Sequence, residues 1–176
     1  MSREETVRAF EGYYDEYADA IFRHCLFRTS DRERARELTQ ETFMRTWEYV
    51  ARGNEIHNAR AFLYKVASNL VTNEVARRRK HISLEVLRET YGFDVPDPVD
   101  SIPGAAVDGG LLIAKLSELK ESHRIVLTYR YVDNLSVSEI ATLLGKSQNT
   151  VSVRIHRALK ELKKRVDAVE TEVSIG

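Results

Sequence analysis

Apolar residues recur at helical spacing in two adjacent segments near the C-terminal end of the chain, between residues 135 and 162. The first segment opens with Ser136, a residue type that caps helix N-termini, and the second opens with Ser147. Gly145 lies between them, where a chain leaving a helix often needs the positive φ that glycine adopts at little cost. The apolar positions are Ile140, Ala141 and Leu144 in the first segment and Val151, Ile155, Ala158, Leu159 and Leu162 in the second. The pattern predicts a helix, a tight turn and a second helix.

The face of the second helix that lies away from this apolar stripe is polar and basic. Hydrogen-bonding and cationic groups dominate it and carboxylates are rare, which suits a helix whose N-terminal half meets base edges in DNA. The small residue Ala141 lies where the two helices must pack closely. Short amphipathic helix pairs also occur in ordinary helical bundles, yet together these features favour a DNA-binding helix-turn-helix. Its exposed residues are expected to be Gln148, Asn149, Ser152, Val153, His156, Arg157 and Lys160.

Three longer amphipathic segments precede this motif in the first half of the chain. One has apolar residues from Phe10 to Ile21, and a second follows a capping box formed by Ser30 and Glu33. A third begins at the capping residue Asn58 and ends in the basic run at residues 77–80. Two further helices are expected around residues 111–119 and 124–132. Because no run alternates between apolar and polar residues as a half-buried strand does, the predicted fold is all-α.

Residues 92–110 separate these two groups of helices. All three prolines and four of the eight glycines fall there, together with four aspartates. This composition predicts an extended acidic linker rather than a helix. We therefore divide the chain into an N-terminal helical domain at residues 1–82, a flexible acidic linker at 83–110, a C-terminal helical domain at 111–166 and a tail at 167–176.

Charge is distributed in blocks, although the chain as a whole carries no net charge. Residues 60–80 hold six basic residues and one acidic residue, and residues 145–166 hold seven basic residues and one acidic residue. The first 59 residues, by contrast, hold nine basic and twelve acidic residues. Two basic blocks in separate domains favour two contacts with nucleic-acid phosphates.

Composition excludes several other classes of protein. The single Cys25 rules out an internal disulfide and a multi-cysteine zinc site, and the five histidines lack metal-ligand spacing. No segment approaches the roughly 18 consecutive apolar residues of a membrane span, and we expect no signal peptide. We expect a cytoplasmic protein that binds no metal, cofactor or small-molecule substrate and is not an enzyme. Cys25, on the apolar face of the first helix, is expected to be buried.

Three blocks of the sequence resemble those of a bacterial RNA polymerase sigma factor of the extracytoplasmic-function type, which is group IV of the sigma-70 family. Residues 37–45, ELTQETFMR, resemble the segment that binds the polymerase core. Residues 60–73, which lead into the basic run, resemble the segment that melts and reads the −10 element, and residues 116–162 resemble the −35-binding domain. The domain that separates the two in larger sigma factors is absent. The resemblance implies a protein that directs polymerase core to specific promoters and initiates transcription there.

The resemblance also implies roles for individual residues of the −10 and polymerase sites. Asn69 and Asn73 lie four positions apart, so they share one side of a helix, and an amide can pair with a base edge through both its donor and its acceptor. Tyr64 could stack on an opened base. Arg77 and Arg78 are the other residues expected to bind the −10 element. The residues expected to bind the polymerase core are Glu37, Gln40, Glu41 and Phe43.

The predicted −35 site lies on the helix-turn-helix. Lys146 stands where the family usually has an apolar residue, and its aliphatic stem could still cover the core. Arg154 lies close to the apolar stripe, so packing and phosphate contact suit it better than base reading. The full set expected to contact the −35 element is Lys146, Ser147, Gln148, Asn149, Ser152, Val153, Arg154, His156 and Arg157.

The resemblance implies three partners. They are promoter DNA, an anti-sigma factor and the polymerase core, which would be contacted at its β′ clamp helices and its β flap. Three other hypotheses stay open. In a conventional helix-turn-helix regulator, similar to a response-regulator output domain, residues 1–82 would be a sensor or dimerisation module. An enzyme could use Glu41, His24 or Cys25, but no nucleophile–base pair supports it. A helical adaptor would leave both basic blocks unexplained.

Overall fold

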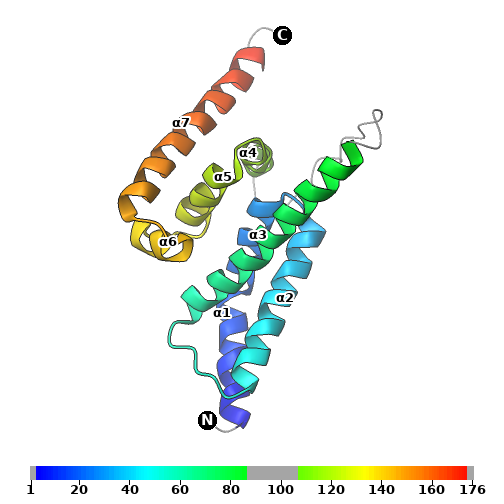
Figure 1. Cartoon of the computed structure of the whole chain (residues 1–176), viewed down its shortest axis with the longest axis vertical. Coiled ribbons are helices and arrows are strands. Elements are labelled where there is room, and N and C mark those ends of the chain that lie inside the picture. The colour runs from blue at the N-terminus through cyan, green and yellow to red at the C-terminus, as the bar shows by residue number, and fades with distance from the viewer. Residues whose placement is uncertain (1–2, 87–106, 174–176) are drawn as a thin grey trace.

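The computed structural model describes residues 3–86 and 107–173, and every regular element within these ranges is a helix (Figure 1). The predicted all-α fold is thereby confirmed. Helices α1 to α3 form an N-terminal bundle, and α4, α5 and α6 pack against the long α7. The elements are α1 (Arg3–Thr29), α2 (Arg32–Ala51), α3 (Ala59–Val86), α4 (Val107–Ser117), α5 (Glu121–Leu127), the π-helical turn η1 (Thr128–Val132), α6 (Val137–Leu144) and α7 (Gln148–Val173).

The N-terminal bundle is held together by an apolar core to which all three of its helices contribute. Its fully buried side chains include Ile21, Leu26, Ala35, Leu38, Leu63, Ala67 and Val71. Removal of this apolar surface from water is the main force that stabilises the bundle. Cys25 lies among these residues and is buried as predicted. Tyr14, which lies between Phe10 and Ile21 in the same helix, is 52% exposed.

Side-chain caps set where two of these helices begin. Asn58 Oδ1 accepts the backbone N–H of Ala61 at 2.9 Å, which confirms the predicted cap of α3. The predicted capping box of Ser30 and Glu33 is wrong. Asp31 is the N-cap of α2, and its Oδ1 accepts the backbone N–H of Arg34 at 3.0 Å. Ser30 has a positive φ of 55° and turns the chain between α1 and α2.

The helix-turn-helix has the predicted form. Ser136 and Glu139 make a reciprocal capping box at the start of α6, and Gly145 follows its last residue with a φ of 61°. Ser147 Oγ accepts the backbone N–H of Thr150 at 3.1 Å where α7 begins. The helix expected around residues 124–132 is divided between α5 and η1. Local capping therefore fixes both helices of the motif and the turn between them.

Helical backbone extends into both ends of the predicted linker. Helix α3 continues to Val86 and α4 begins at Val107, so the first and last four residues of the stretch 83–110 are helical. The predicted tail from residue 167 begins within α7, which continues to Val173. The middle of the linker, residues 87–106, lies outside the described residues. The division into domains at these boundaries stays a prediction.

The two groups of helices are in direct contact. Helix α1 packs against η1 and α4, and Lys65 of α3 reaches the carbonyl oxygen of Leu143 on α6 at 3.4 Å. Figure 1 shows the C-terminal helices on the side of the bundle formed by α1 and α3, with α2 on the other side. One face of the N-terminal bundle is therefore covered by the C-terminal helices.

Candidate nucleic-acid interface

The exposed face of α7 matches the predicted reading surface. Val151, Ile155 and Ala158 are buried and form the apolar side of the helix. Leu159, which was predicted to extend this stripe, is 38% exposed, so the buried side is narrower than expected. Each of the following predicted contact residues is exposed at the N-terminal half of α7 or in the turn before it: Lys146, Ser147, Gln148, Asn149, Ser152, Val153, His156 and Arg157.

Two basic residues at this surface differ in their setting. Lys146 is exposed in the turn before α7, which leaves its amine accessible. Its backbone N–H donates to the Ala141 carbonyl at 3.0 Å and closes the end of α6, while the expectation that its stem covers the core stays a prediction. Arg154 is half-buried beside the apolar side of α7, as its position in the pattern predicted.

The two ends of α7 differ in how their charges are compensated. In the C-terminal part of the helix, Glu161 lies 2.6 Å from His123 and 3.1 Å from Arg165. Within the described part of the chain, no carboxylate lies within ion-pair distance of Arg154 or Arg157. Because uncompensated cations attract phosphate most strongly, the N-terminal half of α7 is the part best suited to nucleic acid.

Helix α3 presents the two predicted asparagines together. Asn69 and Asn73 are both exposed and, at a spacing of four residues, lie on the same side of the helix. Phe62, an aromatic residue on the same helix, is half-buried, and the centre of its ring lies 4.7 Å from that of Tyr49 on α2. The asparagine pair is thus the accessible polar feature on this part of α3.

Tyr64 does not lie where a base could stack on it. Its side chain is only 2% exposed, and its ring meets that of His24 edge-on at 5.6 Å. The Arg60 guanidinium lies 6.0 Å from the centre of the ring. Burial raises the pKa of the tyrosine hydroxyl well above its ordinary value. In this arrangement of the helices the predicted stacking role of Tyr64 is blocked.

Arg77 and Arg78 are not free cations. Both donate to Glu74, whose carboxylate is buried between them and Arg34 of α2. Arg78 also donates to Asp31 Oδ2 at 2.8 Å. Burial by itself would raise the pKa of Glu74, but the hydrogen bonds from the three arginines together lower it. The basic run at the end of α3 is therefore partly neutralised, which its sequence did not indicate.

The residues predicted to bind polymerase core divide into exposed and buried ones. Glu37 and Gln40 are exposed on α2, and Glu41 is half-buried and paired with Arg45 at 2.6 Å. Phe43 is only 3% exposed and packs edge-on against the ring of Tyr14. It belongs to the core of the bundle, so its predicted place at a partner surface is wrong for this structure.

Met44 is the apolar residue that the sequence analysis missed at this surface. It is 57% exposed and follows Gln40 by four positions, so both lie on one face of α2. The same spacing argument that grouped Asn69 with Asn73 would have found it. A flexible, polarisable thioether next to exposed polar groups suits a protein interface.

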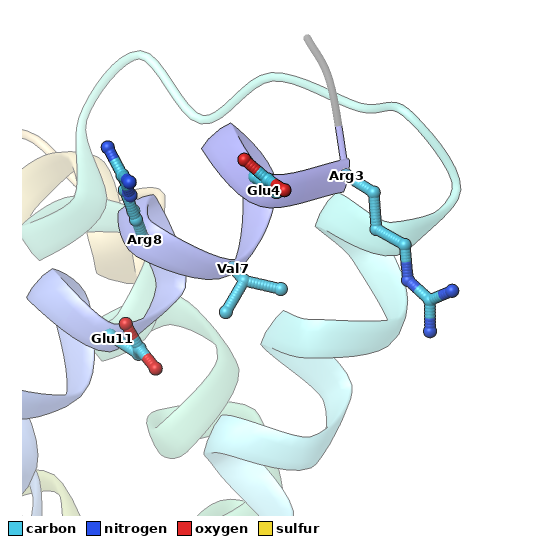
Figure 2. A pocket seen from close by; sticks show the side chains of 5 residues that line it. All are labelled: Arg3, Glu4, Val7, Arg8 and Glu11. Atoms are coloured by element: carbon cyan, nitrogen blue, oxygen red, sulfur yellow. The ribbon is translucent and has the colours of Figure 1, made fainter.

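Other kinds of site have little support in the described residues. Among them, no group of three or more His, Cys, Asp or Glu side chains is arranged to hold a metal ion. No helix in the described ranges is long and apolar enough to cross a membrane. A shallow pocket near the start of α1 is lined by residues of that helix alone, and Figure 2 shows Arg3 pointing away from Arg8 and Glu11. These side chains do not converge on a common point, as those of a small-molecule site do.

Comparison with known proteins accounts for both halves of the chain. Residues 13–81 match the family described as Sigma-70 region 2, and residues 110–162 match Sigma-70, region 4. The first match includes the segment that ends in the basic run, and the second includes the helix-turn-helix. A sensor or dimerisation module at residues 1–82, as in a conventional regulator, is therefore not favoured.

Individual relatives cover nearly the whole chain. The ECF RNA polymerase sigma factor SigL of Mycobacterium tuberculosis is 34% identical over 153 residues, which span 85% of this chain and 84% of SigL. The RNA polymerase sigma factor YlaC of Bacillus subtilis is 30% identical over 168 residues, which span 95% of this chain and 97% of YlaC.

A solved structure shares the fold. The sigma factor RpoE of Bartonella quintana, in a co-crystal with the anti-sigma factor NepR, has a TM-score of 0.73 at 17% identity. The match covers 91% of this chain and 98% of RpoE. With two sigma-70 regions in the family's order and relatives aligned over most of their length, the chain belongs to the extracytoplasmic-function family of RNA polymerase sigma factors.

Proposed function

We propose that this sigma factor reads the −35 promoter element with the exposed face of α7. The single observation that carries the proposal is a helix, capped by Ser147 at its start, whose N-terminal half exposes amides, hydroxyls and uncompensated cations together. Such groups bond to base edges and phosphates in the major groove. The proposed contact residues are Lys146, Ser147, Gln148, Asn149, Ser152, Val153, Arg154, His156 and Arg157.

The test first needs a promoter that this sigma factor uses, and transcription of genomic DNA from the source organism identifies one. The chain and bacterial core polymerase are incubated with fragmented genomic DNA, and the run-off transcripts are sequenced to identify promoters. A duplex that contains one −35 element then reports binding by the full chain. We expect Arg157→Ala and His156→Ala each to weaken binding, since a good base contact contributes about 1–3 kcal/mol of discrimination.

Lys164→Ala is the matched control for this test. Lys164 is exposed on the same helix, two turns beyond the proposed contacts. The Lys164→Ala variant should bind the duplex almost as well as the wild type, and any small loss should be the same for all DNA sequences. None of the three variants should change the affinity for core polymerase. Promoter footprints that are identical for wild type, His156→Ala and Arg157→Ala would remove α7 from the reading surface.

For the −10 element, we propose that Asn69 and Asn73 read bases on the opened strand. Their joint exposure on α3 supports this, because each amide offers a donor and an acceptor to a base edge. Arg77 and Arg78 would contact phosphates after exchanging part of their bonding to Glu74. Tyr64 could stack on a base only after the C-terminal helices leave α3.

For polymerase core, we propose that the exposed face of α2 binds the β′ clamp helices and that the C-terminal domain contacts the β flap. The face of α2 is formed by Glu37, Gln40, Glu41 and Met44, with Phe43 supporting them from the core. This surface lies on the side of the bundle away from the C-terminal helices (Figure 1). Polymerase can therefore reach it while the two halves of the chain are in contact.

We further propose regulation by an anti-sigma factor, by analogy with Bartonella RpoE, which was crystallised with NepR. The protein would act in the cytoplasm, where polymerase and promoter lie, with no catalytic activity, cofactor or small-molecule substrate of its own. The acidic segment 83–110 would link a polymerase-binding domain at 1–82 to a −35-binding domain at 111–166. Cross-linking of the chain to proteins of its own cell, followed by mass spectrometry, would identify the inhibitor.

A further inference from the structure

A network of charged side chains ties the C-terminal half of α7 to α5 and α4. His123 Nδ1 of α5 lies 2.6 Å from Glu161 Oε2 of α7. Arg165, one turn further along α7, donates from Nη2 to Glu161 Oε1 and from Nη1 to Glu118 Oε2 of α4, both at 3.1 Å. Lys115 of α4 also donates to Glu118, at 2.8 Å from Oε1. We call these five residues the α7 brace.

The α7 brace is suited to fixing a direction more than to stabilising the fold. Its side chains are between 17% and 40% exposed, and solvent screens pairs of this kind, so they contribute little to stability. Hydrogen bonds from His123 and Arg165 lower the pKa of Glu161, and those from Lys115 and Arg165 lower the pKa of Glu118. Both carboxylates are therefore ionised at neutral pH. Because a guanidinium has a fixed planar geometry, one that binds carboxylates on two helices defines how those helices lie.

The apolar side of α7 leaves its direction less sharply defined. Val151, Ile155 and Ala158 are buried where α7 packs on α5 and α6. Crossing angles in this kind of packing scatter by about 15–20° around the preferred values. Among the described residues, both ion pairs that join α7 to other helices belong to the brace. The brace is therefore the directional contact that restricts rotation of α7 about its apolar side.

A small rotation of α7 would matter at the end that is proposed to read DNA. Gln148 comes seven positions before Ile155, which is about 10 Å along a helix that rises 1.5 Å per residue. A tilt of about 15° around Ile155 would thus displace Gln148 by roughly 3 Å. Hydrogen bonds form only over a donor–acceptor range of about 2.7–3.2 Å, so such a shift breaks a base contact or moves it to another base.

We propose that the α7 brace is a specificity-determining support of the reading helix. It holds the direction of α7 relative to α4 and α5, and so decides which base edges His156 and Arg157 reach. Its members are positioning residues that need not touch DNA. The proposal rests on the proposed role of α7 in reading the −35 element. Loss of the brace should lower discrimination between base pairs more than general DNA binding, because the exposed cations at the start of α7 remain.

The direction of α7 can be measured in the free full-length chain by electron spin resonance. Spin labels are attached at Ala114→Cys on α4 and Ser152→Cys on α7, both exposed positions, and the native Cys25 is buried. We expect a narrow distance distribution in the labelled chain and a broader or shifted one once Glu161→Ala is added. Ser122→Ala, at an exposed position of α5, is the control and should keep the narrow distribution. A distribution that Glu161→Ala leaves unchanged would overturn the proposal.

Binding to DNA supplies the second measurement. The full chain is titrated with the −35 duplex identified by transcription and with duplexes that each carry one changed base pair. The ratio of the two dissociation constants is the discrimination, which is roughly 5- to 150-fold for a good base contact. We expect Glu161→Ala and Arg165→Ala each to lower the largest ratio about threefold or more, with little change in affinity for an unrelated duplex. A variant that is merely less stable would lose affinity for every duplex by the same factor, so its ratios would not change.

Exchange of the paired residues tests the contact itself. His123→Glu combined with Glu161→His again places a carboxylate opposite an imidazole, and it should restore the ratios that each single exchange lowers. Ratios that stay at the wild-type value in Glu161→Ala and Arg165→Ala would disprove the proposal, as would a double exchange no better than the single ones. The distance measurement needs no DNA. Failure of the brace is therefore distinguishable from failure of α7 to read the −35 element, which Arg157→Ala reports.

Discussion

Arg34 Nη2 of α2 lies 2.9 Å from Glu74 Oε2 of α3, and this ion pair ties the start of one helix to the basic end of the other. The Glu74 carboxylate is buried and also accepts from Arg77 and Arg78. A carboxylate surrounded by three guanidinium groups stabilises the bundle only while it is ionised, so the contribution of Glu74 to stability depends on pH.

We expect Glu74→Gln to lower the free energy of unfolding at neutral pH by about 1–3 kcal/mol, the usual effect of removing a buried charged partner. The pKa of Glu74 is lowered in the folded state, so its contribution is present above the ordinary value of 4.5 and is lost as the pH falls through the folded-state pKa. Urea unfolding at pH 7 and at successively lower pH measures this.

The difference in stability between wild type and Glu74→Gln should therefore be constant above about pH 5 and shrink in more acidic solution. Glu48→Gln, a substitution at an exposed position of α2, is the control and should show neither effect. A difference that persists undiminished at low pH would mean that the carboxylate charge is unimportant there.

Alanine substitution at two glycines should change the stability of the protein in opposite directions. Gly145 has a φ of 61°, so Gly145→Ala forces an L-residue into the left-handed region and should cost about 1–2 kcal/mol. Gly12 lies within α1, where Gly12→Ala should stabilise the protein by about 0.5–1 kcal/mol. An added Cβ would meet no atom within 4 Å at either position, so backbone conformation alone decides the sign. Thermal unfolding of both variants provides the comparison.

Replacement of Asn69 and Asn73 together by alanine should block promoter melting while −35 duplex binding is spared. The two amides lie on α3, whereas the proposed reading face lies on α7, so the two steps should separate. Permanganate reactivity of opened thymines measures melting, and mobility shift with the −35 duplex measures binding. Glu48→Gln, at an exposed position of α2, is the control. Melting at the wild-type rate in the double variant would refute the base-reading role.

Cys25 should be inert to thiol reagents in the native protein. Its side chain is buried, and burial raises the pKa of the thiol to about 12, so the reactive thiolate is scarce at neutral pH. The thiol reagent DTNB should react at the rate of global unfolding, and faster only in denaturant. In a Glu48→Cys variant the added thiol should react at once. Rapid native labelling of Cys25 would show that α1 opens locally.

The helix-turn-helix could be predicted closely because its determinants are local. A capping box joins residues three positions apart, and Gly145 needs only its own backbone freedom to end α6. The cap of α2 shows the limit of such reasoning, since Ser30 and Asp31 are both good capping residues and adjacent. The turn after α1 gives Ser30 a positive φ, so Asp31 becomes the cap.

Exposure was harder to predict than helix position. Phe43 and Met44 are adjacent apolar residues of α2, and the sequence places both near the polymerase-binding segment. In the bundle, Phe43 packs against an aromatic ring from α1, whereas Met44 points to solvent. Helical periodicity groups residues by face, but which face meets a neighbour depends on how the helices pack.

Amino-acid sequence alone determined the helices, the caps of the helix-turn-helix, the two basic blocks and the membership of the family. Only the tertiary structure decided which of those charges are free, because Glu74 and Asp31 neutralise part of one block while the start of α7 has no such partner in the described residues. It also decided that His24 meets Asp133, which is 109 positions away. Caps and periodicity depend on residues within about one helical turn, whereas such a pairing depends on how two groups of helices that are far apart in the sequence pack together.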